Sequence, residues 1–485
     1  MSNTASSLPD LATPLPTLRH GALGLRHAVV ISVAVMSPAA SIFFNTIPQA
    51  GYVGAAIPLC YVIGFVVALL MANQYSEMSR ELPSSGSAYT FVVEGLSLRW
   101  GFLIGWIGLI AVALGVPYSF ILMSANVQTL VFRWFGLNLH WSFWFVAAIG
   151  IVFAICYVGI RQSLSVDLTF LAFEIGVCLV LAIIVLSHVG GQGGLTAAPF
   201  SVSQVPQNGN LTAGIILGVL SFIGFETAAT LGDETRNPRR NIPRAVFGSM
   251  LVVGLFYVLM AYVATIGYGV NNMATGYAND PAPFDTISHN FSGGAFTVLV
   301  DIAGVLSFFG AALAIVNGGA RIIYTVGRDG LFPRWTTRLH ASRQTPVGAI
   351  TALCIFGLIS GLALGFALEP INAFGFLGIL DALFVMLIYL LVNIACFRFF
   401  RRKRRAGFSL IRHALCPALS TLFIGAIFLA LFVSPGDFPL NLAPYVVAVW
   451  VIGGAGILFF MRDKITSSPV LVASQHQEVG STEAQ

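Results

Sequence analysis

Residues 27–48 read HAVVISVAVMSPAASIFFNTIP, an apolar stretch with the length of one membrane crossing and a break at its centre. A helix needs about 20 apolar residues to cross the hydrocarbon of a bilayer. Pro38 stands in the middle of the stretch and cannot donate a hydrogen bond to the helix. The residues around it are all small: Ser37, Ala39, Ala40 and Ser41. The stretch therefore predicts a membrane-spanning helix that is interrupted halfway.

A second interrupted stretch, GIILGVLSFIGFETAATLGDE, occupies residues 214–234. Gly224 lies at its centre, with Ser221 before it and Glu226 after it. Taken singly, a proline kink and a glycine packing contact explain such features, because both residues are frequent in membrane helices. The two stretches are, however, the first and sixth spans, which are equivalent positions if ten spans form two repeats of five. Matched breaks predict an inverted-repeat transporter whose substrate binds where the helices unwind.

The composition of the chain is that of a membrane protein. Hydrophobic residues make up 57% of its 485 residues, charged residues only 9%, and the mean hydropathy is +0.87. A soluble chain has roughly a quarter of its residues charged, so lipid is the expected solvent. The apolar segments that can span a membrane are 24–48, 52–73, 98–128, 142–160, 165–187, 211–233, 245–269, 293–322, 347–367, 371–397, 414–433 and 441–461.

These spans predict an all-α polytopic membrane protein with about 12 transmembrane helices in one domain, flanked by two polar tails. The N-terminal tail lacks the apolar core and cleavage site of a secretory signal. The expected parts are a disordered cytosolic tail at 1–23, a transmembrane domain at 24–461 with repeat 1 at about 24–187, repeat 2 at about 211–397 and helices 11 and 12 at about 414–461, and a disordered cytosolic tail at 462–485.

Basic residues orient the chain in the membrane. If both termini are cytosolic, the inside segments hold every lysine and arginine except Arg133. The two long outside loops, 188–210 and 270–292, contain neither residue type. This segregation follows the positive-inside rule and predicts an inner (cytoplasmic) membrane protein. The basic run RFFRRKRR at 398–405 is interpreted as a stop signal beside lipid headgroups, not as a nucleic-acid site.

The sequence offers no motif for an enzyme, a metal or a cofactor. The six cysteines are scattered through apolar segments without a C-x-x-C spacing, and no two histidines lie four residues apart. No Walker loop, nucleophile elbow or zinc-binding helix is found. We therefore expect a protein that is not an enzyme and has no cofactor. The expected partners are a small-molecule substrate, protons and the lipid bilayer; the sequence sets no oligomeric state.

Four blocks in the order and spacing of a known family resemble the amino acid–polyamine–organocation (APC) superfamily over about residues 25–460. The blocks are YSEMSRELPSSGSAYTFVVEGLSLRWGFLIGW (75–106), SFIGFETAATLGDETRNPRRNIPRA (221–245), NGGARIIYTVGRDGLFPRW (317–335) and FGFLGILDALFVMLIYLLVNIACFRFFRR (374–402). The resemblance implies a leucine-transporter-like 5+5 inverted repeat plus two extra helices, working by alternating access. A shorter set, SPAAS, PSSGSAYTF and SFIGFETAATLGDET, also looks like putrescine importers of the same superfamily.

The resemblance also implies where the substrate binds. Backbone amides at the first break would hold a carboxylate, and carbonyls at the second would receive an ammonium group, as the half-helix dipoles favour. Phe222 and Phe225 are candidates for an aromatic lid. The predicted binding residues are Ser37, Ala39, Ala40, Ser41, Leu220, Ser221, Phe222, Gly224 and Phe225. Pro38, which has no amide, departs from the glycine-rich break of many members, and Leu109 and Leu220 argue against a guanidinium substrate.

Four acids are placed within the spans: Glu174, Glu226, Asp301 and Asp381. A charged acid at mid-bilayer costs on the order of 3 kcal/mol, so such residues are often functional. By the resemblance, Glu174 falls where many family members carry a coupling lysine. The simpler alternative is that Glu174 is a neutral side chain hydrogen-bonded to a neighbouring helix. Glu174, Glu226 and Asp381 are the candidates for proton coupling, and Asp301 is left without a role.

Together these features predict a secondary active transporter that imports an amino acid or related amine across the cytoplasmic membrane, driven by protons. An alternative is a polyamine or organic-cation transporter or exchanger of the same superfamily. A non-transporting membrane sensor is a third, less favoured class, because the sequence shows no signalling domain.

Overall fold

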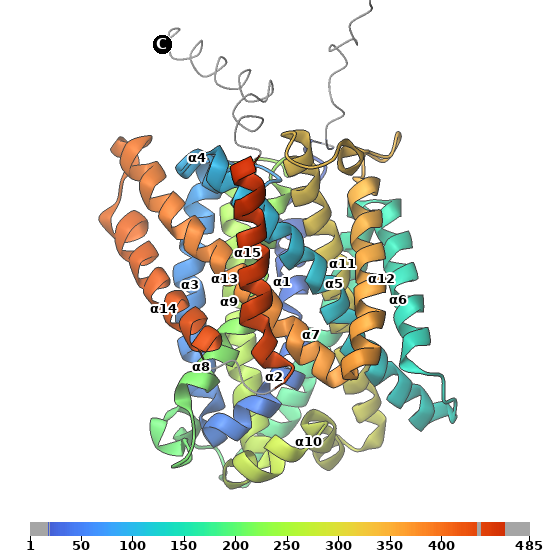
Figure 1. The fold of residues 1–485 in the computed structure, drawn as a ribbon. Coiled ribbons are helices and arrows are strands. Elements are labelled where there is room, and N and C mark those ends of the chain that lie inside the picture. The colour runs from blue at the N-terminus through green and yellow to red at the C-terminus, as the bar shows by residue number, and fades with distance from the viewer. Residues whose placement is uncertain (1–17, 19, 434–437, 461–485) are drawn as a thin grey trace, which may run out of the picture.

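The computed structural model is helical throughout the part of the chain that it describes, which is residue 18, residues 20–433 and residues 438–460. Figure 1 shows a bundle of long helices, most of them running between two opposite faces. The start of α1 and the end of α15 lie at the same face, the upper one in Figure 1, which we call the terminal face. The tail predicted at 462–485 lies outside the described residues, as does 1–23 apart from residues 18 and 20–23.

Eleven helical runs among the described residues are long and apolar enough to cross a membrane. One of them, Leu25–Glu81, is 57 residues long, which is far more than a single crossing requires. Its first part, residues 25–53, runs from the terminal face to the opposite face. The chain turns back at Gly54, and α3 (Ile57–Glu81) returns to the terminal face (Figure 1). Ten single crossings and this double one make twelve, and the predicted fold class is confirmed.

The crossings fall into two successive groups of five, followed by two more helices. The first group is α1 (Leu25–Met36) with α2 (Pro38–Val53), α3 (Ile57–Glu81), α5 (Leu98–Phe135), α6 (Trp141–Val158) and α7 (Ile160–Gly191). The second group is α8 (Leu211–Leu220) with η4 (Phe225–Leu231), α9 (Pro238–Tyr268), α11 (Gly294–Arg328), α12 (Val347–Leu368) and α13 (Pro370–Arg402). The last two are α14 (Cys416–Val433) and α15 (Ala443–Phe460). The first crossing of each group is interrupted.

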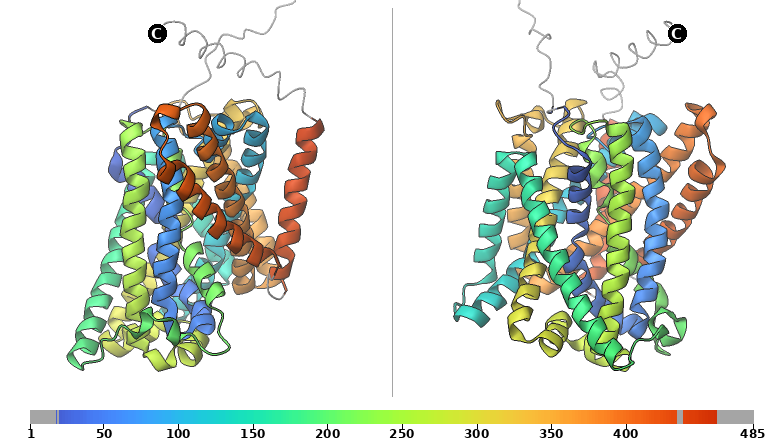
Figure 2. Two further views of the ribbon diagram at one scale, coloured as in Figure 1. Left: turned by 90° about the vertical axis from the view of Figure 1, so that its left-hand side faces the viewer. Right: turned by 180° about the vertical axis from the view of Figure 1, so that it is seen from behind.

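The interrupted helices lie at the centre of the bundle. α1 contacts η4, α7, α9 and α11, while α3 packs along α9 and α5 along α13. Figure 2 shows α3 and α9 side by side in both views. The outer helices expose apolar side chains instead, such as Ile359 on α12, Leu422 on α14 and Val449 on α15. Such exposed apolar surfaces suit a lipid solvent, which has no cost for apolar contact.

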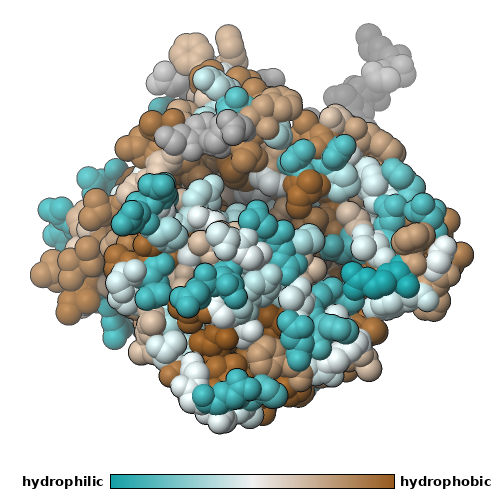
Figure 3. Space-filling model, turned by 90° about the horizontal axis from the view of Figure 1, so that it is seen from below, coloured by the Kyte–Doolittle hydropathy of each residue, from teal (hydrophilic) through white to brown (hydrophobic). Residues whose placement is uncertain are grey.

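Two short helices cover the ends of the bundle. α4 (Ala88–Gly95) lies at the terminal face, and α10 (Pro283–Ser292) lies at the opposite face (Figure 1). Viewed from the opposite face, hydrophilic residues are spread across the surface and hydrophobic ones are exposed at its left edge (Figure 3). A polar end surface and apolar flanks are the pattern expected where a bundle leaves the hydrocarbon for water.

Several helices are longer than the apolar segments that predicted them. α3 continues to Glu81 where 73 was expected, and α5 continues to Phe135 where 128 was expected. α7 begins at Ile160, five residues before the predicted span. Hydropathy marks where side chains stop being apolar. The hydrogen-bonded helix itself continues through polar residues that have a high helix propensity. The early start of α7 matters below, because it places Ser163 inside the helix, one turn before Asp167.

Candidate functional site

The first break separates α1 from α2 at Ser37. Its φ of 43° and ψ of 71° put a residue other than glycine in the left-handed region. Pro38 follows as the first residue of α2, where its fixed φ suits a helix start and its missing N–H is not needed. The Ser41 hydroxyl donates to the Met36 carbonyl at 2.8 Å and so satisfies an acceptor that the break leaves free.

Protein groups already bind the amides at the start of α2. The Ala40 N–H donates to the Ser307 hydroxyl of α11 at 3.1 Å, and the Ser41 N–H donates to the Ser37 carbonyl at 2.9 Å. The Ala39 amide and the Ser307 hydroxyl lie beside the carboxyl group of Glu174 on α7, whose Oε2 has no hydrogen-bond partner among the described residues. Glu174 is buried. Because it lies beside Ala39 at the start of α2, it is near the positive end of the α2 helix dipole. The predicted carboxylate cradle therefore holds a carboxyl group of the protein itself.

The second break runs from Ser221 to Gly224, between α8 and η4. Gly224 has a φ of 114°, and a Cβ there would meet the side chain and backbone of Val35 on α1. Its N–H donates to Glu226 Oε2 at 3.0 Å. Ser32 of α1 donates to the Phe225 carbonyl at 2.7 Å and accepts from the Ala228 N–H at 2.8 Å. η4 is therefore fastened to α1 by side-chain hydrogen bonds.

Tyr257 of α9 joins the two breaks. Its hydroxyl lies 2.5 Å from the Met36 carbonyl, at the end of α1, and 3.0 Å from the Ser221 carbonyl, at the end of α8. The Ser221 hydroxyl is approached in turn by Asn45 Nδ2 at 3.0 Å and by the Tyr61 hydroxyl at 3.2 Å. The final carbonyls of both half-helices thus converge on one buried tyrosine.

A cavity of about 120 Å³ begins at the second break and extends to the Ser87–Ala88 turn that leads into α4. Among the predicted residues, Gly224, Glu226 and Asp381 line it. Glu226 Oε2 accepts a hydrogen bond from the Tyr389 hydroxyl of α13 at 2.7 Å, so the carboxyl group is held in one orientation. Opposite walls are made of small residues, including Gly318 and Gly319 of α11. None of the described residues that line the cavity is a lysine or an arginine.

The other predicted binding residues are not among those that line this cavity. Phe222 and Phe225 are fully buried: Phe222 stacks on Phe65, and Phe225 packs against Tyr75 and Tyr389. Both rings are part of the packed core in this conformation. Ser37, Ala39, Ala40, Ser41, Leu220 and Ser221 lie at the two breaks themselves.

Asp301 lies on α11, near the face opposite the terminal face. Its carboxylate is 3.4 Å from Arg133 of α5, which is also 3.4 Å from Asp285 of α10. Burial raises the pKa of Asp285, while Asp301 and Arg133 act in the opposite direction through hydrogen bonds. All three side chains border a second cavity of about 240 Å³ between α2, α5, α10 and α11. The single basic residue predicted outside is therefore paired with acids there.

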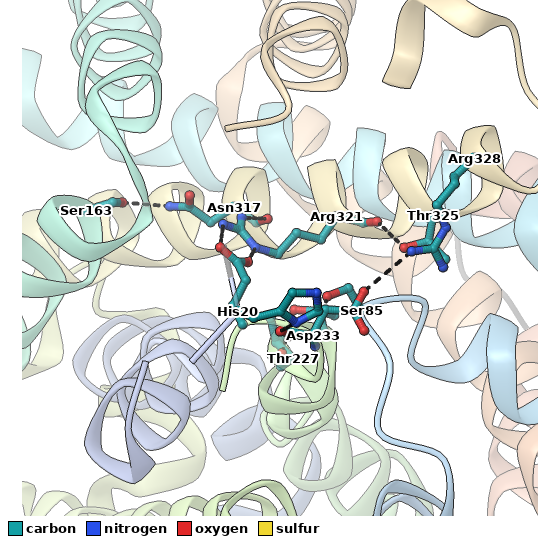
Figure 4. Close-up of polar contacts among 11 residues, drawn as sticks. His20, Ser85, Ser163, Thr227, Asp233, Asn317, Arg321, Thr325 and Arg328 are labelled. Carbon is teal, nitrogen blue, oxygen red and sulfur yellow. Dashed lines mark hydrogen bonds and ion pairs between the residues drawn. The ribbon is translucent and has the colours of Figure 1, made fainter. Parts of the chain in front are cut away.

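The terminal face is closed by a polar network, shown in Figure 4. Arg321 of α11 and Glu234, just after η4, form an ion pair in which both side chains are almost fully buried. Asp233 faces Arg328 at 3.8 Å, and its carbonyl contacts His20 Nδ1 at 2.8 Å. Leu23 is fully buried and exchanges backbone hydrogen bonds with Glu234 and Arg236. The residues just before α1 are thus tied to the segment after η4.

Two features were missed by sequence reasoning. Asp167, a fifth acid within the spans, is fully buried in α7. Its signal was its spacing from Ser163 and Glu174, which puts the three residues on one helix face. The Arg321–Glu234 pair was also missed, because its members lie 87 residues apart and only the tertiary fold brings them together. The described residues contain no group of His, Cys, Asp or Glu that could hold a metal ion.

Comparison with known proteins agrees with this architecture. The model of a family described as amino acid permease matches residues 23–457. A low-affinity putrescine importer of Escherichia coli K12 is 27% identical over 356 residues, covering 70% of this chain and 76% of the relative. A branched-chain amino acid permease of Bacillus subtilis 168 is 26% identical over 339 residues, covering 66% and 70%.

The solved structures that resemble this chain include that of a manganese transporter from Eremococcus coleocola. The TM-score is 0.59 at 13% identity, with 91% of this chain and 94% of the other covered. At that identity the likeness concerns the fold alone. The resemblance seen in the sequence is confirmed, as is the prediction of a membrane transporter rather than an enzyme.

Proposed function

This chain belongs to the amino acid permease family, and from that premise we propose that it imports an amino acid or related amine across the cytoplasmic membrane. The observation that carries the proposal is the cavity at the second break, which Glu226 and Asp381 line without any lysine or arginine among its described residues. An acidic cavity without a lysine or arginine in its described lining favours solutes with an ammonium group and disfavours anions. The two relatives named above carry putrescine and branched-chain amino acids, which both have such a group.

Alternating access is the expected mode of transport. In this proposal the terminal face lies in the cytosol, as the positive-inside rule predicts, and the face that carries α10 lies outside. One cavity lies on each side of the paired breaks, and Tyr257 and the Arg321–Glu234 pair close the space around them. Solute would enter from the Arg133 side, bind at the breaks, and leave past α4 when the terminal face opens.

Amines without a carboxylate are a second candidate class of substrate, and one observation favours them. Two amides would hold the carboxylate of an amino acid: that of Ala40 donates to Ser307, and that of Ala39 lies beside Glu174. A substrate carboxylate would have to displace these groups and would meet a buried acid, whereas an amine needs only the acidic cavity. Glu174 also supports proton coupling, because it gains or loses a charge beside both the breaks and α11.

Uptake into proteoliposomes tests the proposal. We expect labelled putrescine or leucine to accumulate when the outside is made more acidic than the lumen, and Glu174→Gln to abolish accumulation while keeping counterflow exchange. Glu94→Gln, at a surface carboxylate paired with Lys403, is the matched control and should behave like the wild type. Uptake that follows sodium and ignores pH would refute proton coupling. Binding of solute without any uptake would indicate a sensor.

A further inference from the structure

Asp167 is a buried acid that no protein group satisfies. Its side chain is fully buried in α7, and neither carboxyl oxygen has a hydrogen-bond partner among the described residues. It points at α11, where Oδ1 lies 3.6 Å from the position that a Cβ would take at Gly310. An ionised carboxylate left unpaired in such surroundings costs several kcal/mol. The side chain is therefore neutral in this conformation, which means that it carries a proton.

Asp167 belongs to a row of polar groups between α7 and α11, which we call the α7–α11 seam. Ser163, Asp167 and Glu174 lie on one face of α7, spaced by one and then nearly two turns. α11 runs antiparallel to this face. Ser307 lies beside Glu174 at one end, Gly310 faces Asp167, and Asn317 Nδ2 donates to Ser163 Oγ at 2.6 Å at the other end.

The seam continues to the terminal face through charged groups. Arg321 Nη1 donates to the Asn317 carbonyl at 2.7 Å, and the Arg321 guanidinium pairs with Glu234. The Glu234 carbonyl accepts from the Leu23 N–H at 3.0 Å, where the residues before α1 close the surface. Figure 4 shows Ser163 of α7 beside Asn317 of α11, and Arg321 beyond Asn317 along α11. Polar groups thus occur at intervals from Glu174, beside the first break, to the terminal face, and Asp167 is hydrogen-bonded to none of them.

We propose that Asp167 is a proton carrier that receives the coupled proton from Glu174 and passes it towards the Arg321–Glu234 pair. The inference rests on the proposed proton-coupled import. In the first step, which follows loss of the proton that Asp167 carries in this conformation, the O–H bond of Glu174 breaks and an O–H bond forms on the ionised Asp167. In the second, the Asp167 O–H bond breaks and its proton goes to water at the terminal face. The two acids are about 10 Å apart along α7, so water carries the proton between them.

The surroundings of Asp167 suit this role. Glu174 on α7 acts on Asp167, and Asp167 and Arg321 of α11 both act on Cys156 of α6. Tyr257 of α9 faces Glu174 from the other side. Asp167 and Glu174 cannot both be ionised cheaply in so apolar a space, because like charges repel strongly there. When one of the two acids carries a proton, the other can release its own proton, and it does so only when water enters to stabilise the charge.

The test compares wild type, Asp167→Asn, Asp167→Glu and the control Glu94→Gln in proteoliposomes with a pH-sensitive dye in the lumen. The probes are labelled putrescine and labelled leucine, run in parallel. Asp167→Asn should lose at least about tenfold in gradient-driven uptake and in solute-dependent proton entry, and counterflow exchange should persist. Asp167→Glu should restore part of both, because it returns a carboxyl group to the seam.

Infrared difference spectra provide a measurement that does not depend on the solute. A pH step should change a protonated-carboxyl band in the wild type, and this band should be absent from Asp167→Asn. The proposal is overturned if Asp167→Asn follows the gradient as the wild type does, or if it loses counterflow and thermal stability together, which would show a structural role. If neither probe enters wild-type vesicles under a gradient while the band is present, the proposed import fails and the proton on Asp167 stands.

Discussion

At Gly224 two physical constraints act on one residue. Its backbone needs a φ of 114°, and the space where a side chain would start is filled by Val35 of α1. The left-handed region alone costs a residue with a Cβ about 1–2 kcal/mol. The contact with Val35 adds to that cost because backbone atoms of α1 cannot move aside as a flexible side chain can. Gly224 therefore sets both the shape of the break and the approach of α1 to it.

We expect Gly224→Ala to destabilise the protein by at least about 1–2 kcal/mol and to reduce uptake. Gly176→Ala on α7 is the control, because Gly176 is helical and nothing lies within 4 Å of an added Cβ. That variant should be neutral or stabilising by about 0.5–1 kcal/mol. Thermal melts in detergent measure both changes. Equal melting temperatures for the two variants would show that the break is not under strain.

Single residues also show what the sequence can and cannot predict. Pro38 and Gly224 locate both breaks, because their effect on the backbone is local. Hydropathy places Glu174 inside a span. The partner of the Ala40 amide, however, is Ser307, 267 residues further on, and no local pattern links the two. Asp167 stood at the edge of the predicted span, and only the longer α7 and its contact with α11 reveal that it is buried.

At the level of elements, the half-helices are held by hydrogen bonds from their neighbours as well as by bonds to each other. α1 and α8 both end beside the Tyr257 hydroxyl of α9, and Ser32 of α1 fastens η4. Freed carbonyls in a membrane interior must find such donors. Because one hydroxyl serves two helix ends, a movement of either half-helix changes the environment of the other, as alternating access requires.

Tyr257→Phe should therefore destabilise the protein by about 1–3 kcal/mol, the cost of leaving a buried polar group unsatisfied. We also expect weaker binding of a transported solute, because both helix ends lose their fixed positions. Tyr262→Phe, on the same helix, is the matched control: its hydroxyl donates to the Thr196 carbonyl in a loop, away from the breaks. Thermal-shift titration measures both quantities. A similar loss in the two variants would argue against a special role for Tyr257.

For the whole molecule, charge and fold agree on one arrangement in the membrane. The start of α1, the end of α15 and α4 share one face (Figure 1). The basic run at 398–405 includes the last residues of α13, and that end of α13 lies at the same face (Figure 1). Arg133 is at the opposite face with Asp285 and Asp301. An odd number of crossings would put the start of α1 and the end of α15 on opposite faces and would mix basic residues between the two faces.

Labelling of introduced cysteines in intact cells tests this arrangement. Gln207→Cys, in the loop before α8, and Lys403→Cys, after α13, are both at exposed positions. Five of the native cysteines are buried and Cys416 is partly buried, so the parent chain should give a low background. A membrane-impermeant maleimide should modify position 207 from outside and reach position 403 only after the membrane is permeabilised. Labelling of position 403 but not 207 in intact cells would invert the topology, and solute would then leave the cell along the path proposed for its entry.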